Sequence, residues 1–112
     1  MPGEDHDLKV KLALKWVQAN RYEADATVTV TDSRYREGDF RIGMPRGMKG
    51  VPGILYLVFA FTHEGEACDP IVRDVSKSII VPITSCVRDV AAYVLVNGKA
   101  AGCDVARVPE AL

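Results

Sequence analysis

Near its N-terminus the chain reads Leu8-Lys9-Val10-Lys11-Leu12-Ala13-Leu14-Lys15-Trp16. Apolar side chains occupy alternate positions, and lysine predominates at the positions between them. A period of two places successive side chains on opposite sides of a strand, whereas a helix would spread the apolar residues around its circumference. The sequence therefore predicts a strand with a buried apolar side and a solvated side that carries Lys9, Lys11 and Lys15.

The same kind of alternation recurs further along the chain. Residues 24–30 alternate alanine or valine with aspartate or threonine, which is typical of a half-exposed antiparallel strand. We expect a turn at residues 37–39 and then a short strand around Phe40. Residues 79–81 form a β-branched run that ends at Pro82, so this strand lies at a sheet edge or contains a bulge.

Two later segments bear on the tertiary arrangement. Every residue from Ile54 to Phe61 is apolar, so this strand is either central and covered on both sides or faces a partner subunit. Asn97 and Gly98 readily adopt the positive φ angles of a type I′ turn. They predict a hairpin whose second strand covers residues 99–106.

Together these segments amount to about six to eight short strands with no convincing helix. They predict an all-β antiparallel β-sandwich of immunoglobulin-like or Greek-key type, with a small β-barrel as the alternative. The 112 residues support one domain. We place the sandwich at residues 8–108, between loose tails at 1–7 and 109–112, with a glycine- and proline-rich loop at 43–53.

The charges are balanced overall but segregated along the chain. A net charge of −1 argues against a general nucleic-acid binder. Residues 8–22 carry four basic side chains and no acidic one, whereas residues 62–75 carry four acidic side chains and one arginine. Such a dipolar molecule favours oriented association with a specific partner.

The cysteines and the hydropathy pattern bear on the compartment. The spacing of Cys68, Cys86 and Cys103 matches neither a zinc site nor a redox pair. We expect small buried thiols, with one disulfide and a spare thiol as the alternative. The protein is cytoplasmic if Met1 is its true start and secreted if a signal peptide was removed. The apolar runs are too short to span a bilayer.

The sequence contains few candidates for catalysis. His6 lies in the expected tail, so a catalytic dyad or triad would need His63 as the base and Ser85 or Cys86 as the nucleophile. No nucleophile motif surrounds either residue. We therefore assign no catalytic residue and no cofactor, and expect that the protein is not an enzyme.

One acidic cluster keeps a metal-dependent or small-ligand enzyme open as an alternative. His63, Glu64, Glu66, Cys68 and Asp69 lie within seven residues. Their mixture of hard and soft donors matches no common metal preference. A solvated acidic loop is the favoured interpretation, and no metal ligand is assigned.

The basic residues supply the candidate binding site. Arg41, Arg46 and Lys49 flank or occupy the loop at 43–53, whose glycines expose backbone N–H groups that suit an anion such as phosphate. The loop lacks the closing Gly-Lys-Ser/Thr of a P-loop, and a flexible connection between the sheets is the favoured interpretation. The lysine side of the first strand is either an ordinary solvated face or a docking surface for an acidic partner.

These observations favour a non-catalytic interaction module that binds a protein or glycan partner. Self-association would use the apolar strand at residues 54–61. The main alternative is a structural subunit of an ordered assembly, such as a virion, tail or pilus-like particle.

Overall fold

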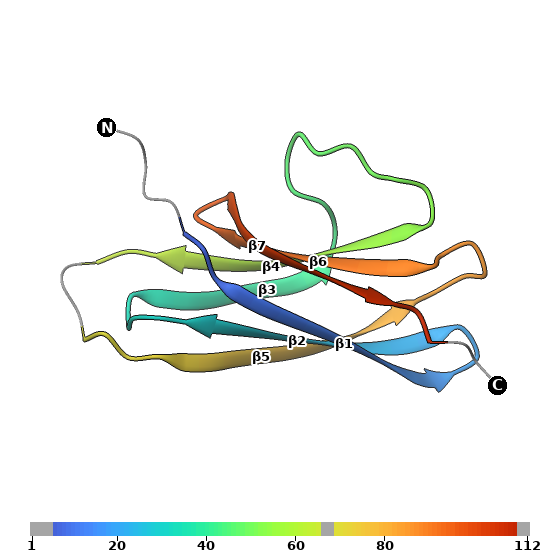
Figure 1. Ribbon diagram of the computed structural model, residues 1–112, viewed down its shortest axis with the longest axis horizontal. Helices are drawn as coiled ribbons and strands as arrows, with labels where there is room; N and C mark the ends of the chain where they lie inside the picture. The colour runs from blue at the N-terminus through green and yellow to red at the C-terminus, as the bar shows by residue number, and fades with distance from the viewer. Residues whose placement is uncertain (1–5, 66–68, 110–112) are drawn as a thin grey trace.

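The computed structural model describes residues 6–65 and 69–109. It shows two packed sheets, with strand orders β1-β2-β5 and β3-β4-β6-β7 (Figure 1). This confirms the predicted all-β sandwich. No helix able to cross a membrane occurs in the described part of the chain. The strands are β1 (Lys9–Gln18), β2 (Arg21–Val30), β3 (Tyr35–Ile42), β4 (Ile54–His63), β5 (Arg73–Pro82), β6 (Asp89–Val96) and β7 (Lys99–Arg107).

The core lies between the two sheets and follows the predicted alternation. Every second residue of β2 is fully buried, at 0% exposure for Ala24, Ala26, Val28 and Val30. On β1, Leu12 is buried opposite Ala26. The apolar side of β1 is nevertheless only partly covered, because β1 is an edge strand. Trp16, near the end of β1, is exposed although the sequence predicts it on the buried side.

The four-stranded sheet contains a parallel pair that the sequence did not indicate. Strands β4 and β6 run parallel, with Ile54 opposite Asp89 and Phe61 opposite Val96. A parallel pair needs a crossover connection between its strands. Here that connection passes through β5 in the other sheet, so the chain returns to the end at which β4 begins.

Strand β3 is longer than predicted. Residues 37–39, expected to form a turn, lie inside the strand as a β-bulge, with the register shift falling between Glu37 and Phe40. A Cβ added at Gly38 would lie 3.2 Å from the carbonyl oxygen of Ala60. The missing side chain lets the two strands stay close, so the glycine serves a bulge rather than a turn.

The predicted hairpin between β6 and β7 is confirmed. Asn97 and Gly98 have φ angles of 51° and 83°, as a type I′ turn requires. The Asn97 side chain also pairs with the backbone of His63: its Oδ1 accepts from the His63 N–H and its Nδ2 donates to the His63 carbonyl, both at 3.1 Å. The turn therefore also ties down the end of β4.

Strand β4 lies between β3 and β6 inside a single chain. Leu57, Phe59 and Phe61 point into the main core, and Tyr56 and Val58 are buried on the opposite side. This agrees with a central strand covered on both sides. The self-association predicted through residues 54–61 therefore lacks the exposed strand face that it requires.

Both open sides of the sandwich are closed by contacts between the sheets. On one side, β1 meets β7: the Leu8 N–H donates to the Ala101 carbonyl at 2.8 Å, and the Leu12 N–H donates to the Asp104 carboxylate at 2.8 Å. On the other side, Arg73 and Lys77 of β5 donate to backbone carbonyls of β3 at 2.8 and 2.7 Å. These contacts occupy backbone groups that an open strand edge would leave available to other chains.

Candidate functional site

The six predicted cationic site residues do not form one site. Three occupy the outer face of the three-stranded sheet, because their neighbours on β2 are the residues that alternate with the buried ones. The other three lie on or beside the loop that connects β3 to β4. The first group is Lys9, Lys11 and Lys15, and the second is Arg41, Arg46 and Lys49.

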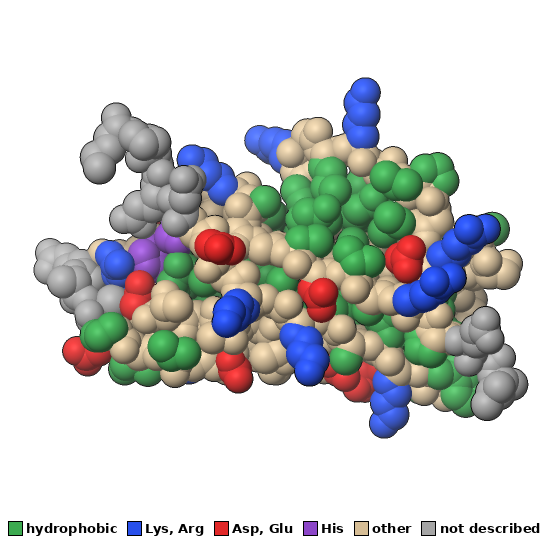
Figure 2. Space-filling model, viewed as in Figure 1, with side chains coloured by type: hydrophobic (Ala, Val, Ile, Leu, Met, Phe, Trp, Pro, Cys, Tyr) green, Lys and Arg blue, Asp and Glu red, His purple; other side chains and the backbone are tan. Residues whose placement is uncertain are grey.

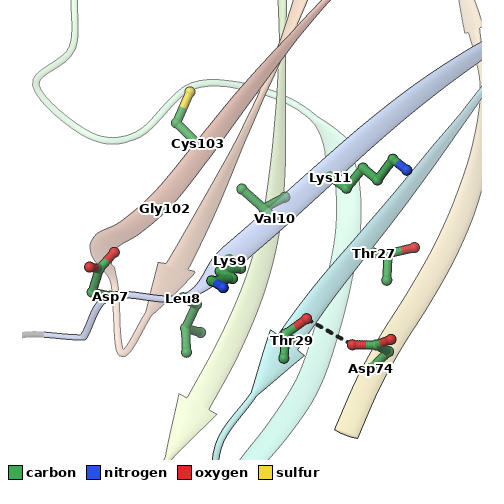
Figure 3. Close-up of a pocket in the computed structure, with 10 residues that line it drawn as sticks. All are labelled: Asp7, Leu8, Lys9, Val10, Lys11, Thr27, Thr29, Asp74, Gly102 and Cys103. Atoms are coloured by element: carbon green, nitrogen blue, oxygen red, sulfur yellow. Dashed lines mark hydrogen bonds between the residues drawn. The ribbon is translucent and has the colours of Figure 1, made fainter.

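A shallow hollow of about 580 Å³ contains part of the first group (Figure 3). It lies over the N-terminal half of β1, with β2 and β5 on one side of that strand and β7 on the other. Lys15 lies on the same face of β1 but outside the hollow. The lining residues are Asp7, Leu8, Lys9, Val10, Lys11, Thr27, Thr29, Asp74, Gly102 and Cys103.

The polar side chains of the hollow stand in cross-strand rows. Lys9 lies opposite Thr29, which lies opposite Asp74, and the Thr29 hydroxyl donates to the Asp74 carboxylate at 2.7 Å. Lys11 lies opposite Thr27, whose hydroxyl is 2.8 Å from that of Ser76. Ammonium, hydroxyl and carboxylate groups thus line one surface of the sheet.

The wall on β7 is made by a glycine and a cysteine. A Cβ added at Gly102 would lie 2.4 Å from the Leu8 carbonyl oxygen, so glycine permits the close approach of β7 to β1. Partial desolvation raises the pKa of the Cys103 thiol even though the residue is exposed, and the carboxylate of Asp104 raises it further, although a hydrogen bond with Tyr93 acts in the opposite direction. The thiol therefore stays protonated and weakly nucleophilic at neutral pH.

The second cationic group lies beside a loop whose amides largely serve the fold. The Gly43 N–H donates to the Tyr56 carbonyl at 3.0 Å, and the Val51 N–H donates to the Tyr56 hydroxyl at 2.9 Å. The Met48 N–H donates to the Pro45 carbonyl at 3.2 Å. These three N–H groups are hydrogen-bonded within the protein, so they are not available to the anion that the sequence suggests for this loop.

A cluster of aromatic and ionisable side chains occupies one end of the sandwich. The His63 Nε2 lies 3.1 Å from the Asp32 carboxylate. The Nδ1 of His6 lies 2.7 Å from the Tyr35 hydroxyl, and the two histidine rings meet edge to face with centroids 4.8 Å apart. His6 therefore packs against the domain instead of belonging to a loose tail.

Asp32 is the most strongly perturbed carboxyl of this cluster. Burial by itself raises the pKa of Asp32, but hydrogen bonds from His63 and from the Arg34 amide and guanidinium, together with the charge of His63, outweigh burial and lower it to about 2. The Arg34 guanidinium lies 3.3 Å from the carboxylate. Asp32 is thus ionised at neutral pH and holds His63 in place.

The positions of Ser85 and Cys86 exclude a catalytic dyad or triad with His63. A Cβ added at Gly53, immediately before β4, would lie 3.6 Å from the Cys86 carbonyl oxygen. His63 is the last residue of β4. Ten residues of strand span roughly 30 Å, so Ser85 and Cys86 lie far from His63, which is itself buried against Asp32.

The acidic cluster after β4 is placed only in part. Glu64 is exposed, whereas Glu66 and Cys68 lie outside the described residues. Within residues 6–65 and 69–109, no group of three or more potential ligands could hold a metal ion. The expectation of buried thiols is wrong for Cys86 and Cys103, since both are exposed free thiols.

The sequence analysis missed the cluster at the end of the sandwich. Its members come from the N-terminal segment, the β2–β3 turn, β3 and β4, so no local spacing links them. Only the arrangement of the strands brings His6, Asp32 and His63 together. Comparisons with protein families, curated proteins and solved structures give no match for this chain.

Proposed function

We propose that this protein is a non-catalytic binding module whose ligand is a glycan, held in the hollow over β1. The observation that carries the proposal is the mixture of hydrogen-bonding groups that converge there. Lys9 and Lys11 only donate, Asp74 only accepts, and the hydroxyls of Thr27 and Thr29 do both. Sugar hydroxyl groups also donate and accept, so each can find a partner on this surface.

The charge arrangement favours a glycan over an acidic protein segment. Every lysine row on this face continues into hydroxyl or carboxylate side chains: Lys9 leads to Thr29 and Asp74, and Lys15 leads to Glu23. An acidic peptide would meet these carboxylates as well as the lysines. A polyhydroxylated ligand avoids that repulsion because it carries no formal charge.

The hollow is also suited to a ligand by its size and rigidity. Its volume of about 580 Å³ lies within the range of small-ligand sites. Thr27 and Thr29 project from the central strand of their sheet, and each is held by a hydrogen bond to β5. Side chains that are already held in place lose less conformational entropy when a ligand binds.

A titration followed by ¹⁵N-resolved NMR tests this proposal. The probes are neutral oligosaccharides of two to six sugar units, chosen from a glycan-array screen of the full chain. We expect shifts confined to the lining residues of the hollow. Replacing Lys9 and Lys11 together by alanine should weaken binding at least about tenfold, because two ligand-facing donors are lost.

Lys15 provides the matched control, since it lies on the same face of β1 but outside the hollow. K15A should leave the affinity unchanged. Equal losses from K15A and from the double variant would indicate a nonspecific charge effect and contradict the proposal. Absence of binding by every neutral oligosaccharide, or shifts that map elsewhere, would also reject it.

A further inference from the structure

An exposed apolar patch lies over the outer face of the four-stranded sheet. Figure 2 shows it as the large group of apolar side chains beneath the β3–β4 loop. Met44, Val51 and Val105 are 46%, 55% and 53% exposed. Together with the half-buried Tyr93 and the buried Tyr56, they form what we call the Met44 patch.

Several contacts fix the shape of the Met44 patch. The Tyr56 hydroxyl accepts the Val51 N–H at 2.9 Å, and the Tyr56 and Tyr93 ring centroids are 6.3 Å apart. Gly50 lies against both Met44 and Tyr56: a Cβ added there would lie 3.2 Å from the methionine sulfur and 3.4 Å from the tyrosine ring. The loop is thus seated on the sheet and presents a formed surface.

The margin of the Met44 patch is predominantly basic. Arg46 and Lys49 project from the loop, and both are exposed. Arg41 of β3 lies opposite Val58 of β4, so its side chain is on the same outer face of the sheet. Arg107 follows two residues after Val105 on β7, and its cross-strand neighbour is Asp89. An apolar patch rimmed by charges is typical of an interaction site, and its partner should be apolar with acidic flanks.

The chain carries such a segment elsewhere on its surface. Ile71 and Val72, immediately before β5, are 48% and 69% exposed. Asp69 and Asp74 flank them, and both are exposed. The Ile71 N–H donates to the Asp69 carbonyl at 2.9 Å, which shapes the segment as a turn. The segment runs into the first two residues of β5, and the Arg73 guanidinium within it donates to the Tyr35 carbonyl at 2.8 Å. We call residues 69–74 the acidic turn.

The acidic turn cannot reach the Met44 patch of its own chain. It follows the end of β4, whereas the patch gathers around the beginning of that strand (Figure 1). The eight residues from Tyr56 to His63 span roughly 20 Å of strand. The two surfaces therefore complement each other only between different molecules.

We propose that copies of this chain associate head to tail, with Ile71 and Val72 of one copy inserted against the Met44 patch of the next. Arg46 and Lys49 then face the carboxylates of the acidic turn. Because the two surfaces differ, two associated copies together keep one free patch and one free turn, and the contact propagates into a ring or an open filament. The contact is small, so the association is weak and depends on concentration.

Sedimentation velocity of the full chain over a concentration series up to about 1 mM tests the contact, a range suited to weak association. We expect the mean mass to rise with concentration. It should fall back when salt is added, because the exposed charge pairs are screened. A sample that stays monomeric at every concentration would overturn the proposal.

Two complementary variants give the decisive experiment. V51D/V105D disables the patch and I71K/V72K disables the turn, and each variant alone should remain monomeric. An equimolar mixture should form a one-to-one dimer and nothing larger, because each partner retains one working surface. A mixture that remains monomeric, or a single variant that still assembles, would refute the head-to-tail contact.

Ile80 supplies the matched control for these variants. It is as exposed as the patch residues but lies on the outer face of the three-stranded sheet. I80D should assemble like the unmodified protein, and a loss of assembly would show that the effect is not specific to the patch. Thermal melting checks that each variant is folded. Because K9A/K11A affects only the hollow, a failure of glycan binding and a failure of assembly are separately detectable.

Discussion

The two sheets differ most in what covers their outer faces. Thr27 of β2 and Val58 of β4 occupy comparable positions, each on the outward side of a central strand of its sheet. Thr27 is half-buried and hydrogen-bonds to Ser76. Val58 is 1% exposed and lies between its cross-strand neighbours Arg41 and Tyr93.

The difference shows how one domain can acquire two unlike surfaces. The three-stranded sheet alternates polar with apolar residues, so its outer face is hydrated and offers hydrogen-bonding groups. The four-stranded sheet carries apolar residues on both faces, and the β3–β4 loop covers part of the outer one. The loop leaves Met44 and Val51 exposed at its surface, which makes this face suited to protein contacts.

The largest expected effect comes from placing the same charge at the two comparable positions. V58D should destabilise the fold by about 4 kcal/mol, because it buries a carboxylate without a partner. T27D should cost less than about 1 kcal/mol, since the position is reached by water. Urea unfolding of both variants measures the difference. Equal costs would show that the outer face of β4 is as hydrated as that of β2.

A smaller effect is expected where the two sheets meet. G102A should cost about 2–3 kcal/mol, because its Cβ would clash with the backbone of Leu8 and separate β7 from β1. G43A is the control: the nearest atom to a Cβ there is the Arg41 Nε at 4.0 Å. Its cost should stay below about 0.5 kcal/mol. Denaturant unfolding distinguishes the two, and a harmless G102A would contradict the close approach of the strands.

The smallest expected effect comes from replacing the carboxylate of Asp32, which is enclosed by its partners, and is compared with the exposed carboxylate of Asp74. The pKa of Asp32 is lowered from 3.8 to about 2 in the folded protein. Its contribution to the free energy of unfolding is therefore complete above about pH 4–5 and is lost as the pH falls toward 2. D32N should therefore cost about 1–2 kcal/mol at pH 7 and almost nothing at pH 2. D74N, on the exposed row of β5, should cost less than about 0.5 kcal/mol.

Urea unfolding of the D32N and D74N variants between pH 2 and pH 7 checks this prediction. The free energy of unfolding of the unmodified protein should fall on acidification, and that of D32N should fall less steeply. If D32N and the unmodified protein kept a constant difference over this range, the Asp32 charge would not be the source of the stabilisation.

The local patterns of the sequence predict much of the fold. The alternation in residues 24–30 identifies β2 and its buried side, and Asn97-Gly98 locates the last hairpin. Both signals depend on neighbouring residues alone: side-chain direction in a strand, and the positive φ angles of a tight turn. The bulge at Gly38 escaped prediction, because its cause is the Ala60 carbonyl on another strand.

The candidate sites divide in the same way. The sequence marks Lys9 and Lys11 as surface residues, but only the pairing of β1, β2 and β5 sets them beside hydroxyl and carboxylate groups. The same lysines on an isolated strand would form a basic stripe. Their separation from Arg46 and Lys49, on opposite faces of the sandwich, likewise depends on which strands share a sheet.

By itself, the sequence determined that the chain forms strands, which side of most strands is buried and where the chain turns. The tertiary structure alone decided that β4 and β6 run parallel, that His6 meets His63, and that the Met44 patch and the acidic turn cannot meet within one molecule. The reason is physical. Strand formation follows from the local period of two, whereas strand order follows from the packing of segments far apart in the chain.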